Sequence, residues 1–212
     1  EKSITIQVDN VELNYAYVSQ RGSYPEDPFK ANQDSYCIHH RICKESDAFF
    51  GVFDGHGNDG DACSIFSKTV LPQQLKQQLE ASGGESRTLN RTQMHEVLTK
   101  AHVSTNDLLR RDKTIDDSLS GTTAISVYFH GNNNNRMTVS NVGDSRAVLG
   151  QSEISESARV SLKALPLSRD QTPYRKDEKA RIRRTGARVL SLDQLEGLEP
   201  IEQSEHGDVD EF

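Results

Sequence analysis

The residues best suited to chemistry stand together at the end of one apolar run. The segment 49–53 is almost entirely apolar, and the motif Asp-Gly-His-Gly at 54–57 follows it directly. An aspartate or a histidine alone at such a place is more often a turn or surface residue. A carboxylate and an imidazole delivered together by a buried strand indicate a functional site, with glycines that let the backbone approach a bound group.

A second carboxylate stands before another expected strand, at Asp34 in the run Asn32-Gln33-Asp34. Two carboxylates and a backbone carbonyl, such as that of Gly55, are hard oxygen ligands that suit Mg²⁺ or Mn²⁺ and not zinc. A paired-metal site of that kind activates water for in-line attack on a phosphoryl group. By itself, Asp34 would be interpreted as a turn residue.

Apolar periodicity predicts the elements that must position these residues. A turn-rich stretch at 21–28 separates the second expected strand from the third, and the strand at 48–53 is expected to be buried on both faces. Helices are expected at 61–79, with a kink or break at Pro72, at 92–109 and at 174–185. Strands are expected at 3–8, 13–18, 35–38, 48–53, 122–129, 137–141, from 147 onward and at 189–190, with an asparagine-rich hairpin loop at 131–135. This order predicts an α+β layered domain with an antiparallel sheet.

Composition excludes several classes of protein. The 212 residues fit one domain, and the 25 basic against 32 acidic residues, a net charge of -7, argue against a nucleic-acid binder. No apolar stretch is long enough for a membrane span. The three cysteines, Cys37, Cys43 and Cys63, do not form a zinc-site pattern and are interpreted as reduced thiols, which suits a cytoplasmic or nuclear location. The absence of an initiator Met suggests a piece of a longer chain.

Several motifs, in order, resemble the PP2C (PPM) family of metal-dependent serine/threonine protein phosphatases. They are FFGVFDGHG, SGTTA at 120–124, NVGDSRAVL at 141–149, LSRDQTP and RIRRTGARV. The resemblance runs from about Tyr15 to Gly197. The runs RGSYPEDPFKANQDSY and GARVLSLDQLEGLEP look closest to a multidomain type, in which the phosphatase precedes cyclic-nucleotide-binding and kinase domains.

The resemblance implies a central antiparallel β-sandwich flanked by helix pairs and a hydrolase acting on phosphoprotein substrates. Two Mn²⁺ or Mg²⁺ ions would be held by Asp54, the Gly55 carbonyl and, through water, Asp34. Asp144 matches the acid that can hold a third ion. His56 would be the general acid that protonates the leaving serine or threonine oxygen. Lys30 is the candidate for binding the substrate phosphate, with Arg21 a poorer one.

The chain also departs from the family pattern. Gln33 stands where the family often has glutamate, and it is expected to accept a hydrogen bond from a metal-bound water without adding charge. Two further metal-binding aspartates of the family have no match, so residues 1–212 are interpreted as the N-terminal portion of a single phosphatase domain with the C-terminal part of the fold missing. The acidic segment 199–212 is expected to be a disordered tail.

Two other functions stay open at this point. A phosphatase-like domain that no longer turns over and instead binds a partner would explain the missing ligands. A metal-dependent nuclease or other phosphodiesterase shares the carboxylate chemistry, but the only basic patch is the expected helix at 175–184.

Overall fold

The computed structural model describes most of the chain. The described residues are 4–8, 11–43, 47–83, 89–130, 136–154 and 160–198. The expected asparagine-rich loop at 131–135 and the acidic tail at 199–212 lie outside them. The chain divides into two compact units, residues 1–168 and 169–212, which are described separately.

The described part of the first unit contains a five-stranded antiparallel sheet, two β-hairpins and one helix pair. Its elements are β1 (Ile4–Val8), β2 (Val11–Tyr15), β3 (Asp34–His40), β4 (Ala48–His56), α1 (Gly60–Ala81), α2 (Arg91–Arg111), β5 (Gly121–Thr122), β6 (Ala124–His130), β7 (Arg136–Val142), β8 (Val148–Ile154) and β9 (Val160–Pro166). The five-stranded sheet has the order β3-β4-β6-β7, with β5 paired to β4, and β1-β2 and β8-β9 each form a two-stranded hairpin.

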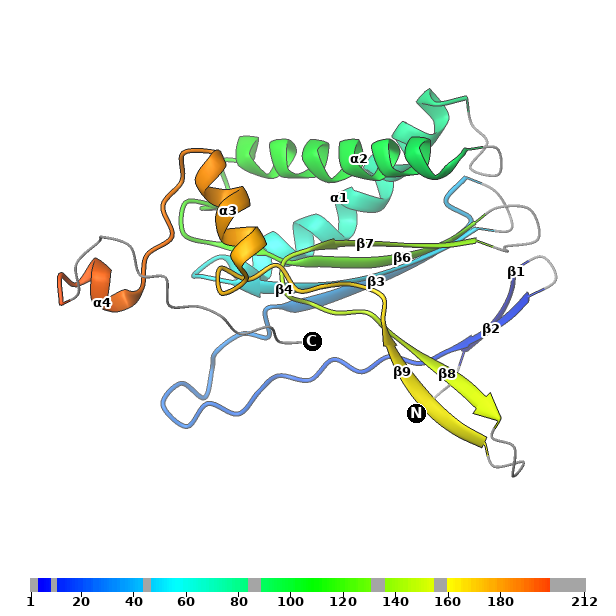
Figure 1. The fold of residues 1–212 in the computed structure, drawn as a ribbon, viewed down its shortest axis with the longest axis horizontal. Coiled ribbons are helices and arrows are strands. Elements are labelled where there is room, and N and C mark those ends of the chain that lie inside the picture. The colour runs from blue at the N-terminus through cyan, green and yellow to red at the C-terminus, as the bar shows by residue number, and fades with distance from the viewer. Residues whose placement is uncertain are drawn as a thin grey trace. The chain divides into compact units, whose positions relative to one another are not determined.

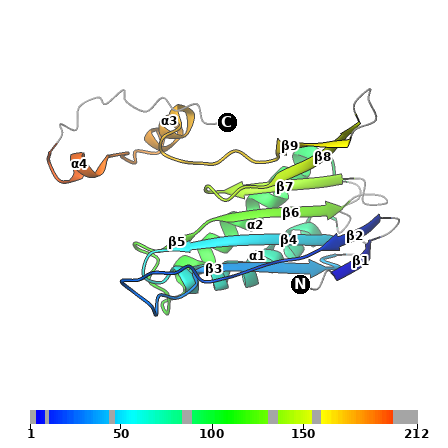
Figure 2. The same ribbon diagram turned by 90° about the horizontal axis from the view of Figure 1, so that it is seen from below.

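Helices α1 and α2 cover one face of this sheet, and the β1-β2 hairpin lies on the other side (Figure 1 and Figure 2). Phe49 and Phe53 of β4 point to the helices and belong to a buried core with leucines of α1 and α2. Between them, Phe50 points to the opposite face, where its ring centroid lies 5.4 Å from that of Tyr15 in β2. Because Val52 on this second face is 49% exposed, the expectation that β4 is buried on both faces is wrong.

The helices follow from their local sequence signals. Asn90 caps α2 by accepting a hydrogen bond from the Gln93 amide, and the Gln93 side chain accepts one from the Asn90 amide, which forms a capping box. Helix α1 runs through Pro72 without a break. Buried residues lie along the whole helix, with Leu71, Leu75 and Leu79 around and after the proline, and this packing offsets the roughly 3 kcal/mol cost of an interior proline.

The expected α+β class with an antiparallel sheet and packed helices is confirmed. In place of a second large sheet, the described residues have two separate two-stranded hairpins, β1-β2 and β8-β9. The described residues contain one packed helix pair, α1 and α2. Strand β9 was not expected, although Val160, Leu162 and Ala164 alternate with the polar Ser161 and Lys163. No helix in this part of the chain combines the length and apolar character needed to cross a bilayer.

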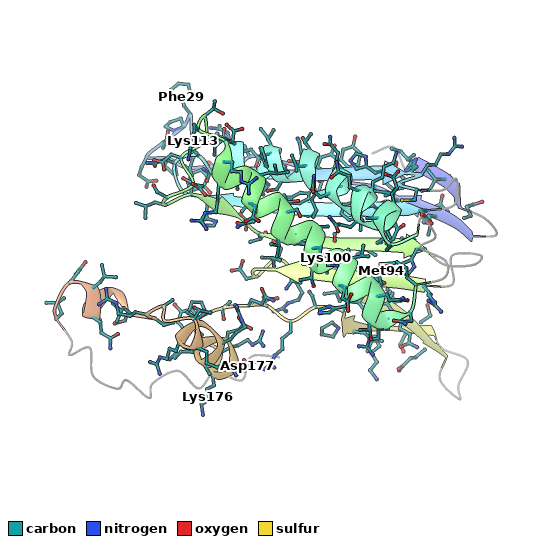
Figure 3. The ribbon with its side chains drawn as sticks, turned by 90° about the horizontal axis from the view of Figure 1, so that it is seen from above. Phe29, Met94, Lys100, Lys113, Lys176 and Asp177 are labelled. Atoms are coloured by element: carbon teal, nitrogen blue, oxygen red, sulfur yellow. The ribbon has the colours of Figure 1, made fainter. Side chains whose placement is uncertain are left out.

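The second unit holds α3 (Lys176–Arg184) and the short α4 (Leu192–Leu195). Helix α3 confirms the helix expected at 174–185, and Gly186 ends it with a φ of 84°. The expected strand at 189–190 is wrong, since these two residues are irregular. The acidic Asp177 and Glu178 in the first turn of α3 stabilise the helix end, and Asp177 pairs with Arg175. Lys176 and Asp177 are labelled in Figure 3.

Candidate active site

The carboxylates of Asp34 and Asp54 lie on neighbouring strands. The antiparallel register of β3 and β4 pairs the two residues directly. Directly opposite residues of an antiparallel pair point to the same face of the sheet, about 5 Å apart at Cβ. Both carboxylates therefore lie on the face opposite the helices, at the end of the sheet where β3 begins and β4 ends (Figure 2).

These negative charges perturb each other. Partial burial raises the pKa of the Asp54 carboxyl, and the charges of Asp34 and Asp144, together with a hydrogen bond to Asp34, raise it further. His56 follows Asp54 by two positions on β4, and both residues are exposed, so alternation along the strand puts their side chains on the same face. Asp34, Asp54 and His56, all singled out from the sequence, therefore lie on one face at this end of the sheet.

The backbone of Asp54 is held by Thr123, a residue that the sequence analysis did not single out. The Asp54 amide donates to Thr123 Oγ1 at 3.0 Å, and the Thr123 amide donates to the Asp54 carbonyl at 2.8 Å. Thr123 Oγ1 also lies 2.6 Å from Ser145 Oγ, in the turn that carries Asp144. Thr123 therefore links the end of β4, which carries Asp54, to the turn that carries Asp144. The neighbouring glycine and threonine in the Ser-Gly-Thr-Thr run were the only local signal.

Gly55 occupies a place where no side chain fits. A Cβ there would lie 2.1 Å from the Gly60 carbonyl oxygen and 2.7 Å from that of Gln33. The Gly55 amide donates to this same Gln33 carbonyl at 3.2 Å. Close approach of three backbone segments explains why glycine follows the aspartate.

The segment 112–121 supports His56 from the side. A Cβ on Gly121 would lie 2.9 Å from His56 Cε1 and 3.1 Å from Nε2, so the ring lies against the bare backbone of Gly121. The Asp59 amide donates to Ser120 Oγ at 3.0 Å, and the Asp116 amide donates to Asp59 Oδ2 at 2.8 Å. These bonds tie the turn after β4 to the segment between α2 and β5. In Figure 3, Lys113 marks this end of α2, and Met94 marks the opposite end.

Lys30 lies in the loop that precedes β3. Its Nζ lies 4.1 Å from the centroid of the Tyr24 ring, a cation–π contact. Arg21 donates from Nη1 to the carbonyls of Pro28 and Lys30. Both basic side chains therefore have contacts within this loop, whose exposed Phe29 is labelled in Figure 3. Lys30 as a phosphate-binding residue stays a prediction.

The donors fit a hard divalent cation in chemical type. Burial, and then the charges of Asp34 and Asp144, raise the pKa of the Asp54 carboxyl, and a bound cation would offset those charges. The number of donor side chains is small. Within the described residues, no group of three or more histidine, cysteine, aspartate or glutamate side chains is close enough to hold a metal ion.

A cavity lies elsewhere in the first unit. It has a volume of about 1100 Å³ and is lined by residues of α2 and β7, among them His102 and Arg136. Residues predicted for the metal site and the general acid are not part of its lining.

Comparison with known proteins identifies the class. The family model of protein phosphatase 2C matches residues 27–198. The chain is 42% identical over 214 residues to probable protein phosphatase 2C 35 of Arabidopsis thaliana, an alignment that covers 97% of this chain and 56% of the relative. It is 32% identical to protein phosphatase 1L of Bos taurus, over 68% of this chain and 36% of the relative. The chain belongs to the protein phosphatase 2C family, and it spans 56% of the length of the first relative and 36% of the second.

Solved structures agree at the level of the fold. A serine-threonine phosphatase 2C from Toxoplasma gondii superposes with a TM-score of 0.54 at 21% identity, over 73% of this chain and 50% of that one. A sex determining protein of C. elegans superposes with a TM-score of 0.55 at 17% identity, over 77% of this chain and 37% of the other. At such identities the likeness supports the shared fold alone.

Proposed function

We propose that this chain carries the catalytic centre of a metal-dependent protein phosphatase acting on phosphoserine and phosphothreonine. The observation that carries the proposal is the pairing of Asp34 with Asp54 at the strand end that also presents His56, with the charge of Asp144 acting on the same carboxyl. Membership of the protein phosphatase 2C family supports the reaction class.

Asp54, the Gly55 carbonyl, Asp34 through water and Asp144 would hold Mn²⁺ or Mg²⁺, two ions with a third at Asp144. When bound, such ions neutralise phosphoryl charge and activate a water molecule. The β3-β4 ladder fixes the backbones of Asp34 and Asp54, and their carboxylate donors are oriented as a result.

His56 would act as the general acid in this reaction. An alkoxide is a poor leaving group, so a proton must reach the serine or threonine oxygen as the P–O bond breaks. His56 is exposed at the end of β4, where a phosphorylated side chain of a folded protein can approach it. Lys30 would contact the phosphate from the loop before β3, which is the least supported of these roles.

Hydrolysis of a phosphothreonine peptide across a Mn²⁺ titration tests the proposal. We expect turnover that a chelator abolishes and that His56→Ala lowers by about 10²–10⁴-fold, the usual contribution of a general acid. His95→Ala is the matched control, because His95 is an exposed histidine on α2 away from the site. Turnover that persists at full rate in His56→Ala would contradict the role of His56.

The second candidate is a phosphatase-like module that binds a partner without turnover. The small number of ligands among the described residues favours it. If a longer chain that contains the rest of the protein hydrolyses the peptide and this chain does not, the segment lacks part of the catalytic centre. If the longer chain is also inactive, the binding function takes precedence.

We further propose that the whole protein is of the multidomain type in which cyclic-nucleotide-binding and kinase domains follow the phosphatase. The similarity of the runs at 21–36 and 186–200 to that type supports this. A cytoplasmic or nuclear location is proposed from the three cysteines, Cys37, Cys43 and Cys63, which form neither an even disulfide framework nor a zinc-site pattern. The complete coding sequence and imaging of the tagged protein test these two points.

A further inference from the structure

Gln33 contacts the backbone on both sides of His56. Its Nε2 donates to the Gly57 carbonyl at 2.6 Å, and its own carbonyl accepts from the Gly55 amide at 3.2 Å. Gly55 and Gly57 are the two chain neighbours of His56. One residue from the segment before β3 therefore brackets the histidine from before and after.

The contact with Gly57 requires a donor. A carbonyl oxygen only accepts hydrogen bonds, so the amide must present its NH₂ group to Gly57. An ionised carboxylate at position 33 would instead place an acceptor against an acceptor. This donor role differs from the one expected from the sequence, in which Gln33 accepts from a metal-bound water.

The surroundings of Gln33 keep the bracket in place. Ser64, a buried residue of α1, donates from Oγ to the Gln33 carbonyl at 2.6 Å. A Cβ on Gly60 would lie 2.8 Å from Gln33 Nε2, so the absence of a side chain there leaves room for the amide. The start of α1 thus supports the bracket from behind.

We propose that Gln33 is a positioning residue that sets the place of the His56 imidazole for proton transfer. The proposal rests on the proposed function, in which His56 is the general acid. The turn at Gly57 has a φ of 84°, a conformation that is unfavourable for most residues, and the Gln33 bond holds the carbonyl of this residue. Without the bond the turn keeps its contacts through Asp59 but loses the one that fixes the Gly57 carbonyl, so the imidazole can shift.

A residue that acts through a general acid has a recognisable kinetic effect. Loss of proton delivery slows the release of an aliphatic alkoxide, but p-nitrophenolate leaves readily as an anion and needs little protonation. Loss of metal binding or of folding lowers the hydrolysis of both kinds of substrate together. The ratio of the two activities therefore separates positioning of His56 from a merely structural role.

The experiment measures kcat for a phosphothreonine peptide and for p-nitrophenyl phosphate at saturating Mn²⁺. The variants are Gln33→Met, which removes the donor at similar size, and Gln33→Glu, which keeps the size and replaces the donor by an acceptor. Gln77→Met, at an exposed glutamine of α1, is the control. Each variant is also compared in thermal unfolding, and Gln33→Met is repeated in a His56→Ala background.

We expect both Gln33 variants to lower peptide turnover by about 10–10²-fold, since a shift of about 1 Å at a catalytic group costs that much. Hydrolysis of p-nitrophenyl phosphate should change less than about threefold. In the His56→Ala background Gln33→Met should add almost nothing, because the two residues act as one unit. Equal losses on both substrates, no loss, or full additivity with His56→Ala would overturn the proposal.

A readout that needs no turnover separates this proposal from the proposed function. The ring signal of His56 in an NMR spectrum, identified by its absence in His56→Ala, should move in Gln33→Met and stay in place in Gln77→Met. If the unsubstituted chain hydrolyses neither substrate, the longer chain decides the proposed function, and this comparison still decides the positioning role. A His56 signal unchanged in both Gln33 variants overturns it.

Discussion

A single methyl group added at Gly121 is expected to displace the His56 ring without unfolding the protein. The added Cβ would lie 2.9 Å from Cε1 of the ring. Carbon atoms in contact are normally about 3.5–4.0 Å apart, so the ring must move by about 0.6–1.1 Å. A displacement of about 1 Å at a catalytic group costs about 10²-fold in rate, and we expect kcat for a phosphothreonine peptide to fall by about 10–10²-fold.

Stability should respond far less than activity to this change. His56 is exposed, so its ring can rotate away, and the free energy of unfolding should change by no more than about 0.5 kcal/mol. Gly150→Ala is the matched control, because a Cβ at that glycine of β8 would have nothing within 4 Å. The assay compares Mn²⁺-dependent turnover with the midpoint of urea unfolding for both variants.

Two results would refute this reasoning. Unchanged peptide turnover in Gly121→Ala would mean that the position of the His56 ring does not matter to the reaction. A fall in turnover that follows a large loss of stability would mean that the methyl group disturbs the fold and not the ring.

Two further predictions concern charge and pH. Burial and the charges of Asp34 and Asp144 raise the pKa of Asp54, so its ionised form destabilises the metal-free fold at neutral pH. Asp54→Asn should therefore raise the melting temperature measured in chelator, and it should abolish Mn²⁺-dependent hydrolysis. The control Asp107→Asn, on α2, should not raise the melting temperature. An unchanged or lower melting temperature in Asp54→Asn would contradict this. Burial lowers the pKa of His102 from 6.5, so the unfolded chain binds the proton more readily and stability should fall as the pH drops below about 6.5. The free energy of unfolding in urea, measured at a series of pH values, should decrease less at low pH in His102→Gln. The control His95→Gln, at an exposed site, should keep the full decrease. If stability depends on pH equally in the two variants, His102 is not responsible.

Short-range patterns in the sequence were sufficient for most of the elements. The apolar period over 61–79 and 92–109 predicted both long helices, because one buried stripe recurs every three to four residues whatever the tertiary context. The apolar run before Asp-Gly-His-Gly predicted a strand at 48–53, which β4 contains and extends to His56, and the family motifs indicated the class. The short irregular stretch at 189–190 was misread as a strand, because two apolar residues carry too little periodicity to tell strand from coil.

The geometry of the candidate site was decided by contacts between segments distant in the sequence. The pairing of Asp34 with Asp54 comes from the register of β3 on β4, and a shift by one residue would have put the two side chains on opposite faces. Thr123 and Gly121 reach Asp54 and His56 only because β5 and β6 pair with β4. Packing selects these registers, and local sequence does not encode them.

Gln33 shows most clearly the difference between what the sequence determines and what the tertiary structure decides. Its position beside Asp34 suggested a hydrogen-bond acceptor for a metal-bound water, since the sequence gives only the residue type and its neighbours. The fold brings the turn after β4 against it, and the Gln33 amide nitrogen donates to the Gly57 carbonyl. The sequence by itself determined which chemical groups the site contains. The tertiary structure decided which of them donate, which accept and which hold His56 in place, because hydrogen-bond roles depend on the partner that packing supplies.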